Sequence, residues 1–172
     1  AALGYFEDLS VAAEGRIGSN SVGGFTYELD YHRSNFSILA QDEFVWPNDS
    51  AVDFVYSYDP DAAAGQQLIF TVNDPFGMSR TLAIDPANPV DFASNGSVDM
   101  DSNAMWIRAA ASKAGSSIAL THLTLNGTSL GYDAIGDKDS GDRLTNLIVE
   151  GVDFSEGFTV TGLATLGWDP NN

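Results

Sequence analysis

The chain has 172 residues, of which 44% are hydrophobic, so it is long enough to form one domain with a full hydrophobic core. It carries 24 acidic and 7 basic residues, a formal net charge of −17, and such a surface repels nucleic-acid phosphates and anionic lipids. It has no cysteine, which excludes disulfides, thiolate metal sites and cysteine nucleophiles. We therefore expect one domain over 1–172, with no nucleic-acid partner and no insertion into a membrane.

The beginning of the sequence fits two explanations, cleavage of a secretion signal or a boundary within a longer chain, and secretion is the one we expect. It starts Ala1-Ala2-Leu3 without a methionine, as a chain does after signal peptidase has cut at a small-residue site. No apolar run approaches the roughly 20 residues that a membrane helix needs. We expect the protein to be extracellular or on the cell surface.

The first half of the chain alternates between apolar and polar residues, which is typical of half-buried strands. Residues 5–14 fit either a short helix or an edge strand. The alternation predicts strands over 25–32, 35–46, 52–58, 68–72 and 80–84. Prolines 86 and 89 then break the pattern.

The second half predicts strands over 104–112, 118–125, 143–151 and 156–168. The stretches 85–103 and 127–142 are rich in Asp, Asn, Ser and Gly and are expected to be irregular. In all, about nine or ten short strands with little helix are expected from alternation of this kind. We predict an all-β fold, an antiparallel β-sandwich or jelly roll.

The strand over 118–125 changes phase along its length. Ile118 and Leu120 share one parity, whereas Leu123 and Leu125 share the other. A one-residue slip of this kind predicts a β-bulge near His122. The Asn126-Gly127 pair that follows predicts a tight turn.

The sequence lacks the arrangements that nucleophilic catalysis needs. His32 and His122 are the only histidines, and no Gly-x-Ser-x-Gly pattern is present. His32 lies on the polar parity of its strand, where a surface role is expected. We expect the protein not to be an enzyme.

Two acidic clusters are candidate calcium sites, and Ca²⁺ is the one cofactor considered. Asp137, Asp139 and Asp142 lie in a loop that does not match an EF-hand, because its glycine is fifth and its twelfth residue is Ile148. Their carboxylates are nevertheless candidate ligands for irregular coordination. The second cluster contains Asp99 and Asp101. The alternative for both is a solvated acidic turn.

Aromatic residues raise the question of sugar binding. Trp46 and Trp168 share the parity of apolar neighbours and are expected in the core. Trp106 shares its parity with Arg108, and these two residues are the candidate ligand-binding pair. Core burial is the alternative for Trp106.

Four Asn-x-Ser/Thr sequons are candidate glycosylation sites. They begin at Asn35, Asn48, Asn95 and Asn126. In a secreted coat protein these asparagines would be the positions able to carry glycans.

Several segments together resemble the choice-of-anchor W domain. They include 13–16, Ala40-Gln41-Asp42-Glu43-Phe44-Val45-Trp46, 52–54, 68–72, 107–109, 113–117, 123–127, 147–151 and 157–162. The likeness spans roughly residues 10 to 168 and depends on the order and spacing of these pieces. It implies secretion by a bacterium with an outer membrane and a C-terminal sorting tail, often of the PEP-CTERM kind. This sequence instead ends at Asn172 without such a tail, and the resemblance supplies no catalytic residues.

Two functional hypotheses follow. The first is a structural subunit of the cell surface or extracellular matrix, which forms homo-oligomers or filaments by terminal strand exchange. In it, residues 1–10 are an extended segment whose apolar anchors are Tyr5, Phe6 and Leu9. The alternative is a carbohydrate-binding module, with or without calcium, whose partner is an extracellular polysaccharide.

Overall fold

The computed structural model describes residues 14–19, 25–32, 36–44, 46–73, 75–85 and 104–169, and before Phe44 it describes the backbone alone. These residues form twelve strands and one 3-10 turn, Phe154–Glu156, and every strand pairing among them is antiparallel. The expected all-β antiparallel class is confirmed. In this part of the chain no helix is long and apolar enough to cross a membrane.

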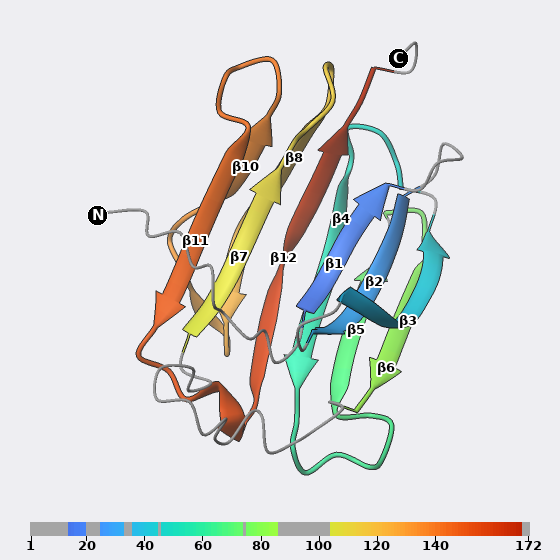
Figure 1. Ribbon diagram of the computed structural model, residues 1–172, viewed down its shortest axis with the longest axis vertical. Helices are drawn as coiled ribbons and strands as arrows, with labels where there is room; N and C mark the ends of the chain where they lie inside the picture. Colours follow the sequence, from blue (N-terminus) through green and yellow to red (C-terminus); the bar gives the residue numbers. More distant parts are fainter. Residues whose placement is uncertain are drawn as a thin grey trace.

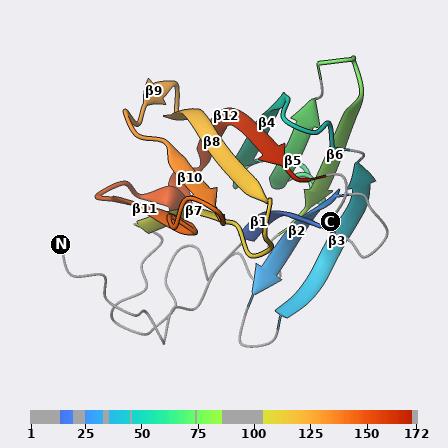
Figure 2. The same cartoon turned by 90° about the horizontal axis from the view of Figure 1, so that it is seen from above.

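The strands are β1 (Glu14–Ser19), β2 (Phe25–His32), β3 (Phe36–Phe44), β4 (Ala51–Tyr58), β5 (Leu68–Asn73), β6 (Ser79–Ile84), β7 (Ala104–Ala110), β8 (Ser117–Leu125), β9 (Thr128–Ser129), β10 (Ala134–Asp137), β11 (Leu144–Glu150) and β12 (Phe158–Gly167). They lie in two layers (Figures 1 and 2). One layer is a large sheet in the order β10-β8-β12-β4-β5-β6, with β9 added to β8. The other holds two separate sheets, β1-β2-β3 and β11-β7. The architecture is that of a β-sandwich.

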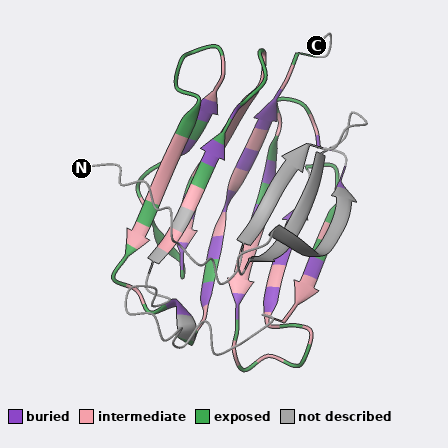
Figure 3. Cartoon of the chain, viewed as in Figure 1, coloured by how far each residue is buried: buried purple, intermediate pink, exposed green. Residues whose placement is uncertain are grey.

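The hydrophobic core lies between the layers and follows strand alternation. In β5, Leu68, Phe70 and Val72 are buried while the residues between them are half-buried (Figure 3). Trp46 is 3% exposed and meets the ring of Phe44 edge-on at 5.3 Å. The expectation that Trp46 is a core residue is therefore confirmed, and Trp168 packs half-buried against the same core.

The predicted bulge in β8 is confirmed. Thr121 pairs with Leu163 of β12 and Thr124 pairs with Thr161, so two residues, His122 and Leu123, stand opposite one. His122 has a φ of 52°, the left-handed conformation found in one class of bulge. The extra residue moves Leu123 to the interior, where its side chain is 1% exposed.

The predicted turn after β8 is also confirmed. Leu125 pairs with Thr128, which leaves Asn126 and Gly127 as the two loop residues, with φ values of 49° and 79°. Positive φ at both positions is what a type I′ hairpin turn requires.

Two expectations about local structure need correction. The stretch 127–142, expected to be irregular, contains β9 and β10, because β8 supplies backbone partners to segments with too few apolar residues for an alternating pattern. The described residues also contain more strands than the nine or ten expected, because β1 (Glu14–Ser19), β9 and β10 were not predicted. The rest of that stretch, where a helix was considered, lies outside the described residues.

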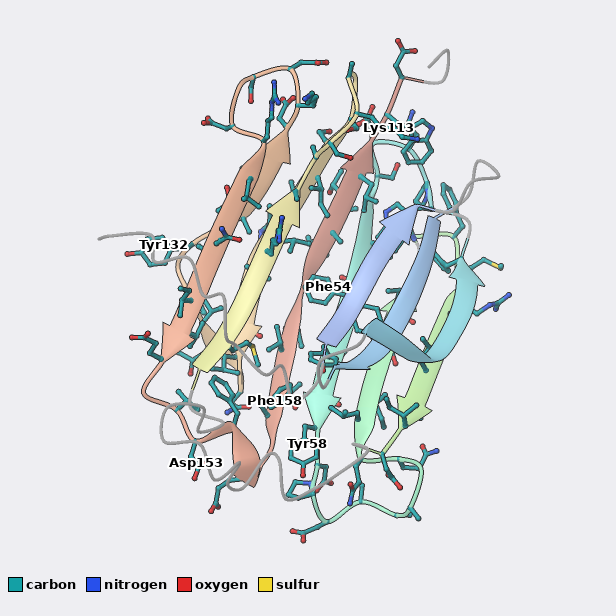
Figure 4. All side chains as sticks on the ribbon, viewed as in Figure 1. Phe54, Tyr58, Lys113, Tyr132, Asp153 and Phe158 are labelled. Carbon is teal, nitrogen blue, oxygen red and sulfur yellow. The ribbon has the colours of Figure 1, made fainter. Side chains whose placement is uncertain are left out.

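An aromatic cluster fills one end of the sandwich. The ring of Phe158 lies 5.8 Å from that of Phe154 and 6.1 Å from that of Tyr58, and Figure 4 shows Phe158 and Tyr58 together near the lower end of β12. Burial, with the nearby Asp59 and Asp61 carboxylates, raises the pKa of the Tyr58 hydroxyl. Tyr58 therefore stays neutral within the core.

The close packing around Gly162 in β12 leaves no room for a side-chain methyl group. A Cβ there would lie 2.9 Å from Leu123 Cδ2 and 2.9 Å from two ring atoms of Phe54. We expect Gly162→Ala to lower the free energy of unfolding by about 1–3 kcal/mol through overpacking, measured by urea denaturation. The control is Thr159→Ala, an exposed position of the same strand, where a change within about 0.5 kcal/mol is expected. Equal effects of the two variants would contradict the packing argument.

Candidate functional site

The acidic loop that joins β10 to β11 uses its carboxylates to hold its own backbone. Asp137 Oδ1 accepts hydrogen bonds from the backbone N–H groups of Asp139 at 2.8 Å and Ser140 at 3.3 Å. Asp139 Oδ2 accepts one from the N–H of Gly115, at 3.0 Å, in the neighbouring β7–β8 loop. These bonds explain the Asp and Ser content of the loop as turn chemistry.

The described residues contain no group of three or more Asp, Glu or His side chains that could hold a metal ion. The carboxylates of Asp137, Asp139 and Asp142 are not gathered into such a group, since Asp137 and Asp139 each accept a hydrogen bond from a backbone N–H group. Irregular calcium coordination by this loop stays a prediction. Asp99 and Asp101, the second candidate cluster, lie outside the described residues.

The candidate ligand-binding pair lies on β7. Arg108 is exposed and stands opposite Asn146 of β11, while Trp106 occupies the position opposite Ile148. The side chain of Trp106 lies outside the described part of the structure. Ile148 is 44% exposed, so the register brings an apolar surface residue next to the Trp106 position.

The sequence analysis did not predict a group of exposed apolar residues in and beside β10 and β11. They are Tyr132, Ile135, Leu144 and Ile148, and Tyr132 is 73% exposed. Figure 4 shows Tyr132 at the edge of the molecule beside β11 and β10. Tyr132 and Ile135 fall in the stretch that was expected to be irregular, where no periodic pattern distinguishes a surface from a core position.

Two of the four sequon asparagines are described, and both hold β12 in place. Asn48 Nδ2 donates to the carbonyl of Trp168 at 3.0 Å, and its Oδ1 accepts from the N–H of Trp168 at 3.0 Å. At the other end of β12, Asn126 Oδ1 accepts from the N–H of Thr159 at 2.8 Å, and the N–H of Asn126 donates to the Thr159 carbonyl at 2.8 Å. Both asparagines are exposed, so a glycan remains a prediction there, and Asn35 and Asn95 lie outside the described residues.

The proposed assembly anchors Tyr5, Phe6 and Leu9 also lie outside the described residues. The described part of the chain contains the sheet edges that such a segment would need. β1 and β3 are the two outer strands of β1-β2-β3, and both strands of β11-β7 are edges of their sheet. Figure 2 places these two strands next to each other in the smaller layer. These two edges are the candidate site for strand addition.

Comparisons with models of protein families, with curated proteins and with solved structures found no match to this chain.

The contacts of Asn48 give a prediction for the stability of β12. We expect Asn48→Ala to lower the free energy of unfolding by about 1–2 kcal/mol, because it removes two hydrogen bonds to Trp168. Asn48→Asp keeps the acceptor for the Trp168 N–H but places a carboxylate oxygen against the Trp168 carbonyl oxygen, so a loss at least as large as that of the alanine variant is expected near neutral pH. Chemical denaturation of the three proteins measures both effects. Variants as stable as the unchanged protein would contradict this assignment.

Proposed function

We propose that this protein is a secreted structural subunit of the bacterial cell surface or extracellular matrix, which assembles with copies of itself by adding a terminal strand to a sheet edge. The observation that carries the proposal is the pair of outer strands, β1 and β7, in one layer of the sandwich. Sheet edges are templates for pairing with another chain, and such pairing depends on the backbone more than on side-chain identity. The resemblance to choice-of-anchor W domains supports secretion from a bacterium with an outer membrane.

The charge of the chain sets conditions on assembly. Each copy carries a formal net charge of −17, so neighbouring copies repel one another. Salt screens this repulsion, with a screening length of about 10 Å at 0.1 M ionic strength. Assembly is therefore expected to be favoured by rising ionic strength, in contrast to binding that depends on opposite charges.

The proposal predicts filaments whose formation depends on residues 1–10. We expect the chain to form regular filaments in electron microscopy at physiological ionic strength, and the chain without residues 1–10 to remain as folded monomers. A matched control is Asp8→Asn, which changes a charge in the segment and keeps its apolar residues. Isolated particles of the 172-residue chain at all salt concentrations, or filaments that persist after the deletion, would overturn the proposal.

The second candidate function is carbohydrate binding, favoured by the exposed surface at the β10–β11 edge. Tyr132 is 73% exposed, and exposed aromatic rings are the usual stacking surface for sugars. Arg108 supplies an exposed polar group on the adjacent β7.

The carbohydrate hypothesis predicts binding in a glycan array that falls at least tenfold in Tyr132→Ala or in Trp106→Ala. The control is Met78→Ala, because Met78 is exposed and precedes β6 at the opposite edge of the large sheet from β10. This variant is expected to bind as the unchanged protein does. Absence of binding to every glycan, with and without Ca²⁺, would exclude this function.

A further inference from the structure

One face of the large sheet is directed away from the two small sheets, and no described strand covers it (Figure 2). In β4, Val52, Phe54 and Tyr58 are buried in the core, so the residues that alternate with them point outward. The register defines a row across five strands, in the order Thr124, Thr161, Val55, Thr71 and Thr81. This row, with the other residues of β8, β12, β4, β5 and β6 that alternate with buried ones, is the outer face.

The outer face is rich in threonine and poor in charge. Seven of the ten threonines of the chain point outward here, three on β12, two on β8 and one each on β5 and β6. Among the described carboxylates, only Asp53 lies on this face, and His122 at the bulge is the other titratable group beside it. The remaining described carboxylates lie in loops, in the 3-10 turn or at strand ends. A chain of net charge −17 therefore has one broad surface that is nearly uncharged.

The hydroxyl groups of the central row bond to one another. Thr71 Oγ1 lies 3.0 Å from Thr81 Oγ1, and Thr124 Oγ1 lies 2.6 Å from Thr161 Oγ1. Val55 separates these two pairs. Because the hydroxyls already have partners, covering the row with another apolar surface leaves few polar groups without a hydrogen bond. The threonine methyl groups and Val55 then provide apolar contact area.

Charge and shape both favour a second copy as the molecule that covers the outer face. Copies of this chain repel one another, and two nearly uncharged faces are where they approach at the lowest electrostatic cost. β-Sheets twist by about 20–25° per strand, so a five-stranded face does not match a flat crystalline polysaccharide. Two sheets of the same twist do stack, with their strands within about 30° of each other.

The area of the outer face is that of a weak but specific contact. Five strands about 4.8 Å apart, each contributing about seven residues at about 3.3 Å, give a planar area of about 550 Å² per copy. Two copies would bury about 1,100 Å² in all, which lies just above the roughly 1,000 Å² expected of a specific interface. Such a contact leaves the protein monomeric when dilute, and its effect adds up where many copies are held side by side.

We propose that two copies stack their outer faces against each other in a two-fold symmetric contact centred on Val55. Val55 lies in the middle strand of the five and in the middle of the row, and it meets the Val55 of the other copy. The threonine pairs on either side of it meet threonine pairs. The contact goes beyond the strand addition proposed above and uses no residue of 1–10, so it joins copies laterally whether or not they are linked through a terminal strand.

Cysteine cross-linking at the centre of the face tests this contact. The chain has no cysteine, so an introduced thiol is the only one present. Stacked sheets lie about 10 Å apart, a distance that a short bismaleimide spans. We expect Val55→Cys chains, concentrated at physiological ionic strength, to give a peptide linked through position 55 of two copies, identified by mass spectrometry. Ser112→Cys, in the exposed β7–β8 loop, measures links from random collisions and is expected to give at least tenfold less.

A pair of charge-matched variants separates the face from the overall charge. Thr71→Lys, next to Val55 in the row, places a charge inside the contact and is expected to lower the yield of the Val55→Cys link at least tenfold. Ser112→Lys makes the same change of net charge away from the face and is expected to keep the link or increase it, because repulsion between copies falls. Circular dichroism checks that both lysine variants are folded.

The outcomes distinguish this contact from the proposed strand addition. Filaments without the link through position 55, or equal yields from Val55→Cys and Ser112→Cys, would overturn the contact and leave strand addition standing. Isolated particles that give the link would refute strand addition and support the contact. Absence of the link together with loss of polysaccharide binding in Thr71→Lys would assign the outer face to a carbohydrate and overturn the proposal.

Discussion

The whole structure depends on the position of β12 at the centre of the large sheet. This strand is the last in the described chain, yet it lies between β4 and β8, which are separated from each other in sequence by three other strands. The large sheet therefore exists only when β12 is inserted between its two parts. Because both sets of pairings are distant in sequence, loop-closure entropy opposes them, and slow folding is expected for such topologies.

Particular residues secure β12 along its length. Asn48 and Asn126 bond its two ends through side-chain amides that take the place of a backbone partner. In the middle, Gly162 leaves room for the ring of Phe54 and for Leu123, and the β8 bulge is what brings Leu123 there. A hydroxyl pair, Thr124 and Thr161 at 2.6 Å, bridges β8 and β12 on the other face. The asparagines of two sequons and the phase slip in β8 thus serve the same structural purpose, which is to hold β12 in the large sheet.

How far the sequence predicted this fold depends on whether a feature is local. The bulge near His122 and the turn at Asn126 follow from neighbouring residues, and both were predictable because side-chain parity and positive φ are local properties. β10 was not predictable, since its strand character comes from β8 and from a close approach of Gly136 to the backbone of Ala109. The order of strands around β12 was out of reach for the same reason, because no local pattern specifies which distant segments pair.

The candidate sites show the same division. Asp137 and Asp139 were considered as calcium ligands because acidic residues cluster there in sequence, but the direction of each carboxylate is set by N–H groups of the loop itself and of the β7–β8 loop. Composition records how many carboxylates are close along the chain and not where they point. Conversely, no residue type in β1 or β7 indicates that the two strands become neighbouring edges. Their placement in one layer depends on how segments far apart in the sequence pack together.

The strong negative charge of the chain bears on which kind of interface can hold copies together. Repulsion between copies that each carry −17 opposes any contact made by side-chain charges alone. A strand added to a sheet edge is held by backbone hydrogen bonds, and this contribution does not depend on the charge of the surface. Interfaces of this kind are therefore the ones that a highly acidic subunit can use, and salt then adjusts the repulsion that remains.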